Sequence, residues 1–284
     1  NSKNKPFGKE KSINFNQIKR KKLVSKIIPF VRGKISILEK KIGHLNDDKN
    51  VLEFVNSGNL KKMAKIGTSC PDHFIRTKKT PIVLNVKIEN KNDNQIIKDI
   101  ENDLEAYRKT YSKYYSKNKR KDSPKIRDSN PIIFLIPKIG MISFAKDKTN
   151  ARLASEFYLN AINVMKGAEG VSSYTGLSDK EAFNIEYWSL EEDKLKRLPK
   201  PKSLSGKIAL ITGGSGAIGK ASAEKILENG GNVFLTDISQ KNMNKTIQEL
   251  EDKYSSDNIK GCQMDVTNEQ NVLEGFKTLL NTFG

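Results

Sequence analysis

Cysteine, histidine and long apolar runs are scarce in this sequence. Its 284 residues include only two cysteines and two histidines. Cys70 and Cys262 stand far apart in unlike contexts, which excludes a disulfide framework and a metal-finger spacing and favours a reducing compartment. No apolar run approaches the length of a membrane span, since PIIFLIP at 131–137 is the size of a strand. Without a secretory segment or an initial methionine, we expect a cytoplasmic protein of which this chain is a part.

An excess of positive charge is the clearest feature of the composition. Lysine and arginine number 51 against 33 aspartates and glutamates, which gives a formal net charge of +18. Such a balance can indicate a nucleic-acid partner. Nearly all the excess is lysine, however, in a sequence also rich in asparagine and isoleucine, and these three residues share A/T-rich codons. Lys117, Lys119 and Lys121 lack interleaved stacking aromatics. We therefore expect a solvated basic surface, with neither a nucleic-acid nor a membrane partner.

Apolar spacing predicts alternating helices and strands before residue 200, which indicates an α/β fold. Helices are predicted over 16–35, over 46–67 as two short helices, and over 93–117, 148–170 and 181–197. Strands are predicted over 81–88, 131–137 and 140–145. The apolar residues at helical spacing in the first helix are Ile18, Leu23, Ile27 and Val31. Pro29 leaves the end of that helix open, and Ser178 with Glu181 has the spacing of a capping box.

The best candidate for a domain boundary lies near residue 200. LPKPKSLSG at 198–206 contains two prolines, two serines and a glycine, a composition typical of a linker. The sequence thus predicts a first domain over 1–199, a linker over 200–206 and a second domain over 207–284.

The segment after this linker has the pattern of a nucleotide-binding unit. A buried strand is predicted over 208–211, a glycine-rich turn over 212–219, a helix after the turn, and a second strand over 232–238. The inner side of that helix is predicted to carry Ala221, Ala223, Ile226 and Leu227. A strand, a glycine turn, a helix and a strand in this order form the context that a dinucleotide fingerprint requires.

The glycine turn has the residue types that a pyrophosphate needs. A phosphate binds backbone N–H groups at the N-terminus of a helix, where no side chain may intrude. Gly213 allows the tight turn and Gly219 lets the helix approach the strand. The residues predicted to face the phosphates or the adenosine ribose are Ser215, Gly216 and Ile218. Asp237 ends the second strand, where its carboxylate can accept hydrogen bonds from the ribose and repel a ribose phosphate, so NAD is favoured over NADP.

At these residues the chain resembles the short-chain dehydrogenase/reductase family. The family pattern Thr-Gly-x-x-x-Gly-x-Gly falls on Thr212, Gly213, Ala217 and Gly219, with an alanine at 217 in place of the middle glycine. CQMDVT at 262–267 is similar to the family's third strand. The resemblance implies that Asp265 and Val266 hold the adenine ring.

The same resemblance implies that the catalytic serine, tyrosine and lysine lie on later strands and helices. None of their motifs occurs here, because the chain ends on the predicted helix EQNVLEGFKTLLNTF at 269–283. We therefore expect the first half of a Rossmann sheet, with no catalytic residue of its own and no dehydrogenase turnover by the chain alone.

Three segments before and across the linker carry a second resemblance. They are GTSCPDHFIRTK at 67–78, the stretch at 140–169 and the stretch at 182–214. Together they resemble bacterial proteins that fuse a class II aldolase/adducin-type domain to a short-chain dehydrogenase, of the rhamnulose-phosphate aldolase/lactaldehyde dehydrogenase type. This resemblance implies an aldolase-like α/β region, in part degenerate, followed by the Rossmann half, and an internal fragment of a longer, homo-oligomeric protein.

A class II aldolase uses a divalent metal, with zinc expected, that several histidines hold. This chain has only His44 and His73, so the resemblance implies that the ligands lie upstream of Asn1. His73 with Cys70 has a ligand spacing, but a polar turn is the favoured interpretation. Arg76 and Lys78 could bind a substrate phosphate, or could be basic residues of a surface turn.

Three functions remain open from the sequence. The favoured one is a bifunctional sugar-degradation enzyme that cleaves a phosphorylated deoxyketose and transfers a hydride between NAD and the aldehyde or alcohol product. The second is an NAD-dependent sugar or polyol dehydrogenase with a non-catalytic partner domain. The third is a module that binds nucleotide or serves only as a scaffold.

Overall fold

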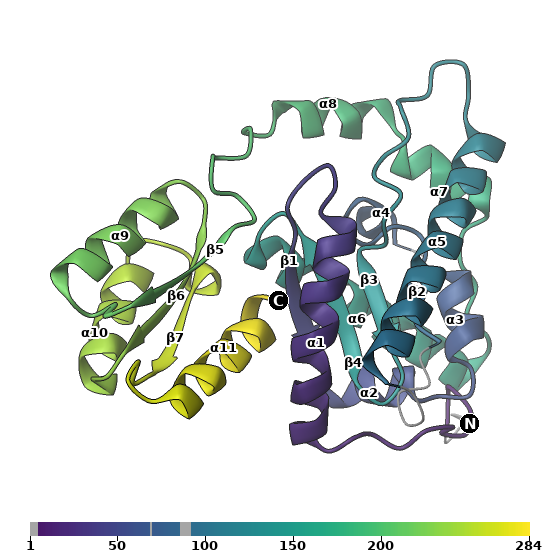
Figure 1. Cartoon of the computed structure of the whole chain (residues 1–284). Helices are drawn as coiled ribbons and strands as arrows, with labels where there is room; N and C mark the ends of the chain where they lie inside the picture. Colours follow the sequence, from purple (N-terminus) through teal and green to yellow (C-terminus); the bar gives the residue numbers. More distant parts are fainter. Residues whose placement is uncertain (1–4, 69, 86–91) are drawn as a thin grey trace. The chain divides into compact units, whose positions relative to one another are not determined.

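The computed structural model describes residues 5–68, 70–85 and 92–284. The chain forms two compact units that do not follow the sequence in order. Unit 1 comprises Asn1–Asn16, Asn46–Ser143 and Leu153–Pro199, and unit 2 comprises Gln17–Leu45, Phe144–Arg152 and Lys200–Gly284. Each contains helices and strands, so the predicted α/β class is confirmed (Figure 1).

The elements follow one another along the whole chain. The helices are α1 (Gln17–Ile35), α2 (Lys49–Val55), α3 (Leu60–Ile66), α4 (Pro71–Thr77), α5 (Asp93–Asn118), α6 (Lys148–Val171), α7 (Asp179–Glu186), α8 (Ser189–Arg197), α9 (Ala217–Glu228), α10 (Gln240–Glu251) and α11 (Glu269–Phe283), with the short 3-10 helix η2 (Ser256–Asn258). The strands are β1 (Ile42–Asn46), β2 (Ile82–Val83), β3 (Ile133–Ile136), β4 (Gly140–Ala145), β5 (Ile208–Thr212), β6 (Asn232–Asp237) and β7 (Ile259–Gln263).

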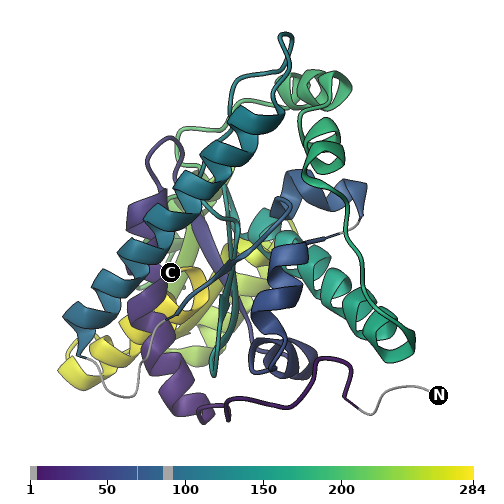
Figure 2. The same cartoon turned by 90° about the vertical axis from the view of Figure 1, so that its right-hand side faces the viewer.

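A mixed sheet organises the first part of the chain. Its strand order is β1-β4-β3-β2, with β2 parallel to β3 and β3 antiparallel to β4. Ile133 and Leu135 of β3 belong to a core that α2, α3 and α6 complete. Figure 2 shows α5 on one side of this sheet and α6 on the other. Apolar residues therefore line both faces of β3, all four of whose residues are buried.

The capping signals near α7 are confirmed, but the length of the predicted helix is wrong. Ser178 accepts a hydrogen bond from the Glu181 N–H, and the Glu181 carboxylate accepts one from the Ser178 N–H, which forms the capping box. The helix then ends at Glu186 and α8 begins at Ser189. Tyr187 is fully buried, whereas α8 buries none of its residues. Helix α8 therefore does not continue the packing of α7.

Three further details correct the sequence analysis of the helices and strands. Helix α1 continues through Pro29 to Ile35, and Ile18 is 81% exposed instead of facing the core. The strand predicted over 81–88 is limited to Ile82–Val83 among the described residues, and 86–88 lie outside them. Ala221 in α9 is exposed, whereas its neighbour Ala223 is buried.

A doubly wound parallel sheet organises unit 2. Its order is β5-β6-β7, and both pairs of strands are parallel. Val233 and Leu235 of β6 pack with residues of α9 and α10. Phe234, between them in sequence, packs with Leu279 and Phe283 of α11. Successive residues of a strand point to opposite faces, so α9 and α10 cover one face of the sheet and α11 covers the other.

The compact units differ from the domains that the linker composition predicts. Helix α1 packs against α11, and Ile42 of β1 joins the apolar cluster of Phe234 and Phe283. Arg32 of α1 donates hydrogen bonds to the carbonyls of Gly206 and Gly284, both at 2.9 Å. These contacts are the reason that residues 17–45 belong to the same compact unit as the parallel sheet. The predicted boundary over 200–206 stays a prediction.

Lys148, the first residue of α6, is a buried lysine whose ammonium group lies at the C-terminal end of α11. It is 8% exposed, and its ammonium donates to the carbonyl of Gly43 at 2.8 Å and to that of Thr282. Burial lowers the pKa of Lys148 from its ordinary value of 10.5 to about 8. Between these two values the unfolded chain binds a proton that the folded chain has released. The free energy of unfolding therefore rises with pH across this window.

This linkage predicts a pH-dependent difference between the natural chain and Lys148→Met. As pH rises from 8 towards 10.5, the natural chain should gain stability relative to Lys148→Met, since the variant lacks the titrating group. Urea unfolding at a series of pH values measures this difference. Lys245→Met, which removes an exposed lysine of the same unit, is the control. A difference between the natural chain and Lys148→Met that stays constant over the window would contradict the expectation.

Candidate functional site

The glycine turn lies where the carboxyl ends of β5 and β6 meet the start of α9. Strand β5 ends at Thr212, and α9 begins at Ala217 with Gly216 as its N-cap. The Gly214 N–H donates to the carbonyl of Thr236 at 3.0 Å, which joins the turn to the end of β6. Ligands bind in this position in open parallel sheets, outside the carboxyl ends of the strands. The predicted strand, turn, helix and strand are therefore all present at the predicted positions.

Two glycines of the turn have a steric requirement for glycine. Gly213 has a φ of +63°, a conformation that L side chains rarely adopt. A Cβ at Gly219 would lie 2.4 Å from the carbonyl oxygen of Gly213 and 2.9 Å from the Cα of Gly214. At Gly216 the nearest atom would be 3.3 Å away. The close approach of α9 to the turn thus depends on Gly219 more than on Gly216.

The backbone N–H groups at the start of α9 are the groups of this site that can donate hydrogen bonds to an anion. The first turn of a helix leaves its N–H groups without carbonyl partners in the helix, and the helix dipole adds partial positive charge there. Ala217 is the first residue of this turn and Ile218 the second. The side chain of Ile218 is 86% exposed and is not packed into the core at this end of the helix. The alanine at 217 adds one methyl group at the first position of this helix.

Asp237 is held in place by the glycine turn. The Ser215 N–H and hydroxyl donate to one oxygen of its carboxylate at 3.1 and 2.5 Å. The Ser239 N–H donates to the other oxygen at 3.0 Å. The hydroxyl of Ser215 is the main cause that lowers the pKa of Asp237, followed by the N–H of Ser239. The carboxylate of Asp237 is therefore held in one orientation. Its lowered pKa keeps it ionised at a lower pH than an ordinary aspartate.

Asp265 and Val266 lie just beyond the third parallel strand. Strand β7 ends at Gln263, so both residues belong to the loop before α11 and not to the strand itself. Asp265 is oriented by the N–H and hydroxyl of Thr267, which donate to one of its carboxylate oxygens at 2.9 and 2.7 Å. The hydroxyl of Thr267 is the main cause that lowers the pKa of Asp265. The Asp265 N–H itself donates to Asn271 at 2.9 Å.

An exposed apolar residue beside Asp237 was missed by the sequence analysis. Ile238 is 66% exposed, Val266 is 61% exposed and Ile218 is 86% exposed, and all three follow the carboxyl ends of parallel strands or begin α9. Large apolar side chains left in water at a ligand-binding edge can pack against a planar ring. The signal in the sequence was the isoleucine directly after the aspartate that ends β6.

The candidate residues of unit 1 do not form a metal site. His73 lies in helix α4, not in a polar turn as predicted, and is only 3% exposed. Its Nδ1 lies 2.8 Å from the hydroxyl of Thr68, and its ring packs edge-on against Phe157. Burial lowers the pKa of His73. Cys70 is a free thiol. Among the residues that the structure describes, no group of three or more histidine, cysteine, aspartate or glutamate side chains could hold a metal ion.

The two basic residues proposed for a phosphate have different surroundings. The Arg76 guanidinium lies over the ring of Phe157, 5.2 Å from its centroid. Lys78 is buried, 5% exposed, and its ammonium lies 3.6 Å from the centroid of Tyr111. Lys78 also lines a pocket of unit 1, whereas Arg76 does not. The structure therefore separates the two residues that the sequence analysis had paired.

Comparison with known protein families identifies two successive parts of the chain. Residues 22–195 match the family model "Aldolase class II, second domain", which covers more than half of the sequence. The chain belongs to the class II aldolase family. Residues 207–284 match the short chain dehydrogenase model, so a class II aldolase domain is followed here by a short-chain dehydrogenase domain. The expected family and its fused order are confirmed.

The chain is similar to several individual proteins. The uncharacterised oxidoreductase YuxG of Bacillus subtilis is 32% identical over 278 residues, 98% of this chain and 40% of YuxG. The 3-oxoacyl-[acyl-carrier-protein] reductase FabG of Vibrio cholerae is 39% identical over 82 residues, 29% of this chain and 32% of FabG. A short-chain dehydrogenase structure from Novosphingobium aromaticivorans is 28% identical, over 25% of this chain and 29% of its own, with a TM-score of 0.23. The chain thus spans less than half of YuxG.

No described helix combines the length and the apolar character that crossing a membrane requires.

The close approach at Gly219 predicts opposite effects for the same substitution at two helical glycines. Gly219→Ala should destabilise unit 2 by about 1–3 kcal/mol, because the methyl group would overlap backbone atoms that cannot move aside cheaply. Gly33→Ala in α1 places its methyl group in open space and should stabilise the chain by up to about 1 kcal/mol. Urea unfolding followed by circular dichroism compares the two. If Gly219→Ala were as stable as Gly33→Ala, α9 would not be seated as described.

Proposed function

We propose that this chain supplies the adenosine-binding half of an NAD-dependent dehydrogenase in a bifunctional sugar-degradation enzyme. The observation that carries the proposal is the oriented carboxylate of Asp237 beside the glycine turn. Ser215 belongs to the turn and donates twice to this carboxylate. The phosphates of a dinucleotide would bind at the N-terminus of α9, and the adenosine ribose would reach the end of β6. The short chain dehydrogenase match supports a nicotinamide cofactor of this kind.

The charge of Asp237 favours NAD over NADP. Three N–H or O–H donors hold its two oxygens, which leaves acceptor capacity for ribose hydroxyls because a carboxylate offers about four lone-pair sites. A phosphate on the same ribose would bring a second negative charge against it. The adenine ring would then lie near Val266 and Ile238, the exposed apolar side chains at the ends of β7 and β6.

The proposed partner reaction is aldol cleavage of a phosphorylated deoxyketose, with the aldehyde product passing to the dehydrogenase. The class II aldolase match supports the reaction type, and the order of the two domains supports their coupling. The described residues do not fit the divalent metal that such an aldolase uses, because they form no cluster of three or more metal-ligating side chains. We therefore assign no step of the cleavage to this chain.

Asp237→Ala tests the cofactor assignment. The variant should bind NAD more weakly by about 1.5–3 kcal/mol, the typical loss of a hydrogen bond to a charged group. It should also discriminate less against NADP, because the repulsion of the ribose phosphate is lost. Isothermal titration of both cofactors measures the two effects. Asp252→Ala, which removes an exposed carboxylate at the end of α10, should leave both affinities unchanged. Equal effects of the two variants would show that Asp237 does not contact the ribose.

A further inference from the structure

Ser215 carries the only side chain in the segment that joins β5 to α9. Between Thr212, which ends β5, and Ala217, which begins α9, the chain has three glycines and this serine. The Ser215 hydroxyl donates to Oδ2 of Asp237 at 2.5 Å, and the Ser215 N–H donates to the same oxygen at 3.1 Å. The one side chain of the turn is thus bonded to the carboxylate that ends β6.

The two oxygens of the Asp237 carboxylate have different partners. Ser215 donates twice to Oδ2, whereas the Ser239 N–H donates to Oδ1 at 3.0 Å. A carboxylate offers about four lone-pair sites, two on each oxygen. The two bonds from Ser215 therefore use the sites of Oδ2, and an acceptor site remains on Oδ1.

These bonds restrict the rotation of the carboxylate. Because donors hold both oxygens, the group cannot turn about its bond to Cβ without breaking a hydrogen bond. The N–H groups of Ser215 and Ser239 belong to the backbone, so the Ser215 hydroxyl is the one of these donors that a side-chain substitution removes. An acceptor that is already oriented loses less freedom when it binds a ligand.

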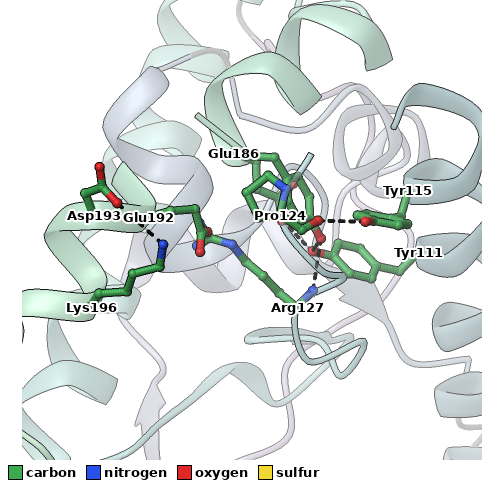
Figure 3. A network of polar contacts seen from close by, with 9 residues as sticks. Tyr111, Tyr115, Pro124, Arg127, Glu186, Glu192, Asp193 and Lys196 are labelled. Carbon is green, nitrogen blue, oxygen red and sulfur yellow. Dashed lines mark hydrogen bonds and ion pairs between the residues drawn. The ribbon is translucent and has the colours of Figure 1, made fainter. Parts of the chain in front are cut away.

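A carboxylate of unit 1 shows how a purely structural group of this kind differs. Glu186 of α7 accepts a hydrogen bond from the Tyr111 hydroxyl at 2.6 Å, within the network of Figure 3. The Tyr114 hydroxyl donates to its other oxygen at 3.2 Å, and Glu186 is only 1% exposed. Burial raises the pKa of Glu186. Such an enclosed carboxylate has no face for a ligand.

Asp237 has hydroxyl and N–H donors too, but it lies at an open edge. It is half-buried, and it follows the carboxyl end of β6, where parallel sheets bind ligands. Hydrogen bonds, led by that of the Ser215 hydroxyl, lower the pKa of Asp237. The orientation that Ser215 imposes is therefore presented to a ligand, unlike that of Glu186.

We propose that Ser215 is a positioning residue that sets the preference of this site for NAD over NADP. Its hydroxyl holds the Asp237 carboxylate so that Oδ1 stays available to a ribose hydroxyl and the negative charge opposes a ribose phosphate. Without that hydroxyl the carboxylate can rotate, and part of both effects is lost. The inference rests on the NAD-binding function proposed for the glycine turn, and it assigns Ser215 no contact with the cofactor.

A double-mutant cycle of Ser215→Ala and Asp237→Ala tests whether Ser215 acts through the carboxylate. Isothermal titration of the full chain with NAD and with NADP gives the affinities of the natural chain, the two single variants and the double variant. Ser215→Ala should weaken NAD binding about three- to tenfold, the scale of one hydrogen bond. Its NADP affinity should stay within about twofold, so the preference for NAD falls. In the Asp237→Ala background, the same substitution should change NAD affinity by less than about twofold, because the carboxylate that Ser215 holds is gone.

Two further variants separate the hydroxyl from other effects of the substitution. Ser215→Thr retains a hydroxyl and should keep NAD affinity within about twofold of that of the natural chain. Ser222→Ala is the matched control, because it removes an exposed hydroxyl of α9 that donates to the carbonyl of Ile218 at 2.8 Å. It should leave both affinities unchanged.

Three results would overturn the proposal while the proposed function stands, because Asp237→Ala would still weaken NAD binding. Losses that add in the double variant would show that Ser215 contacts the cofactor itself. A Ser215→Ala variant that binds NAD as tightly as the natural chain would show that the hydroxyl has no effect. A Ser215→Thr variant as weak as Ser215→Ala would show that the hydroxyl is not the cause. If the natural chain does not bind NAD, or if Asp237→Ala binds it equally well, the proposed function fails and this inference with it.

Discussion

The approach of α9 to the glycine turn is the contact on which the candidate site depends. A Cβ at Gly219 would lie 2.4 Å from the carbonyl oxygen of Gly213, so only glycine permits this geometry without movement of the backbone. With α9 seated, its N-terminus lies at the carboxyl ends of β5 and β6, and Ser215 lies within hydrogen-bond distance of Asp237. One close contact between two short segments thus brings the N-terminus of α9 and the carboxylate of Asp237 to the same edge of the sheet.

The parallel sheet and its helices were largely predictable from the sequence. Strands of continuous apolar residues, a glycine turn and an aspartate at a strand end are local signals, and local signals survive folding when tertiary contacts agree with them. The capping box of Ser178 and Glu181 is confirmed for the same reason, since its two hydrogen bonds join residues three apart. The end of that helix was not predictable, because the burial of Tyr187 against α5 is a long-range contact.

The sequence was less informative about side chains that gather from distant segments. Lys61, Lys78 and Tyr111 line one pocket but come from α3, the segment after α4, and α5. Nothing in their spacing distinguishes these lysines from the many solvated ones. Conversely, Arg76 and Lys78 are two residues apart in sequence, but Arg76 packs against the ring of Phe157 and Lys78 against the ring of Tyr111. The compact units show the same limit, since residues 17–45 join the parallel sheet through contacts with α11 that no local pattern encodes.

The most direct test of the central claim is a crystal structure of this chain with NAD bound. The account predicts that the pyrophosphate contacts the backbone N–H groups at the start of α9, and that the carboxylate of Asp237 accepts hydrogen bonds from the adenosine ribose. It also predicts the adenine ring beside Val266. NAD bound elsewhere on the chain, or a ribose held by a residue other than Asp237, would contradict it.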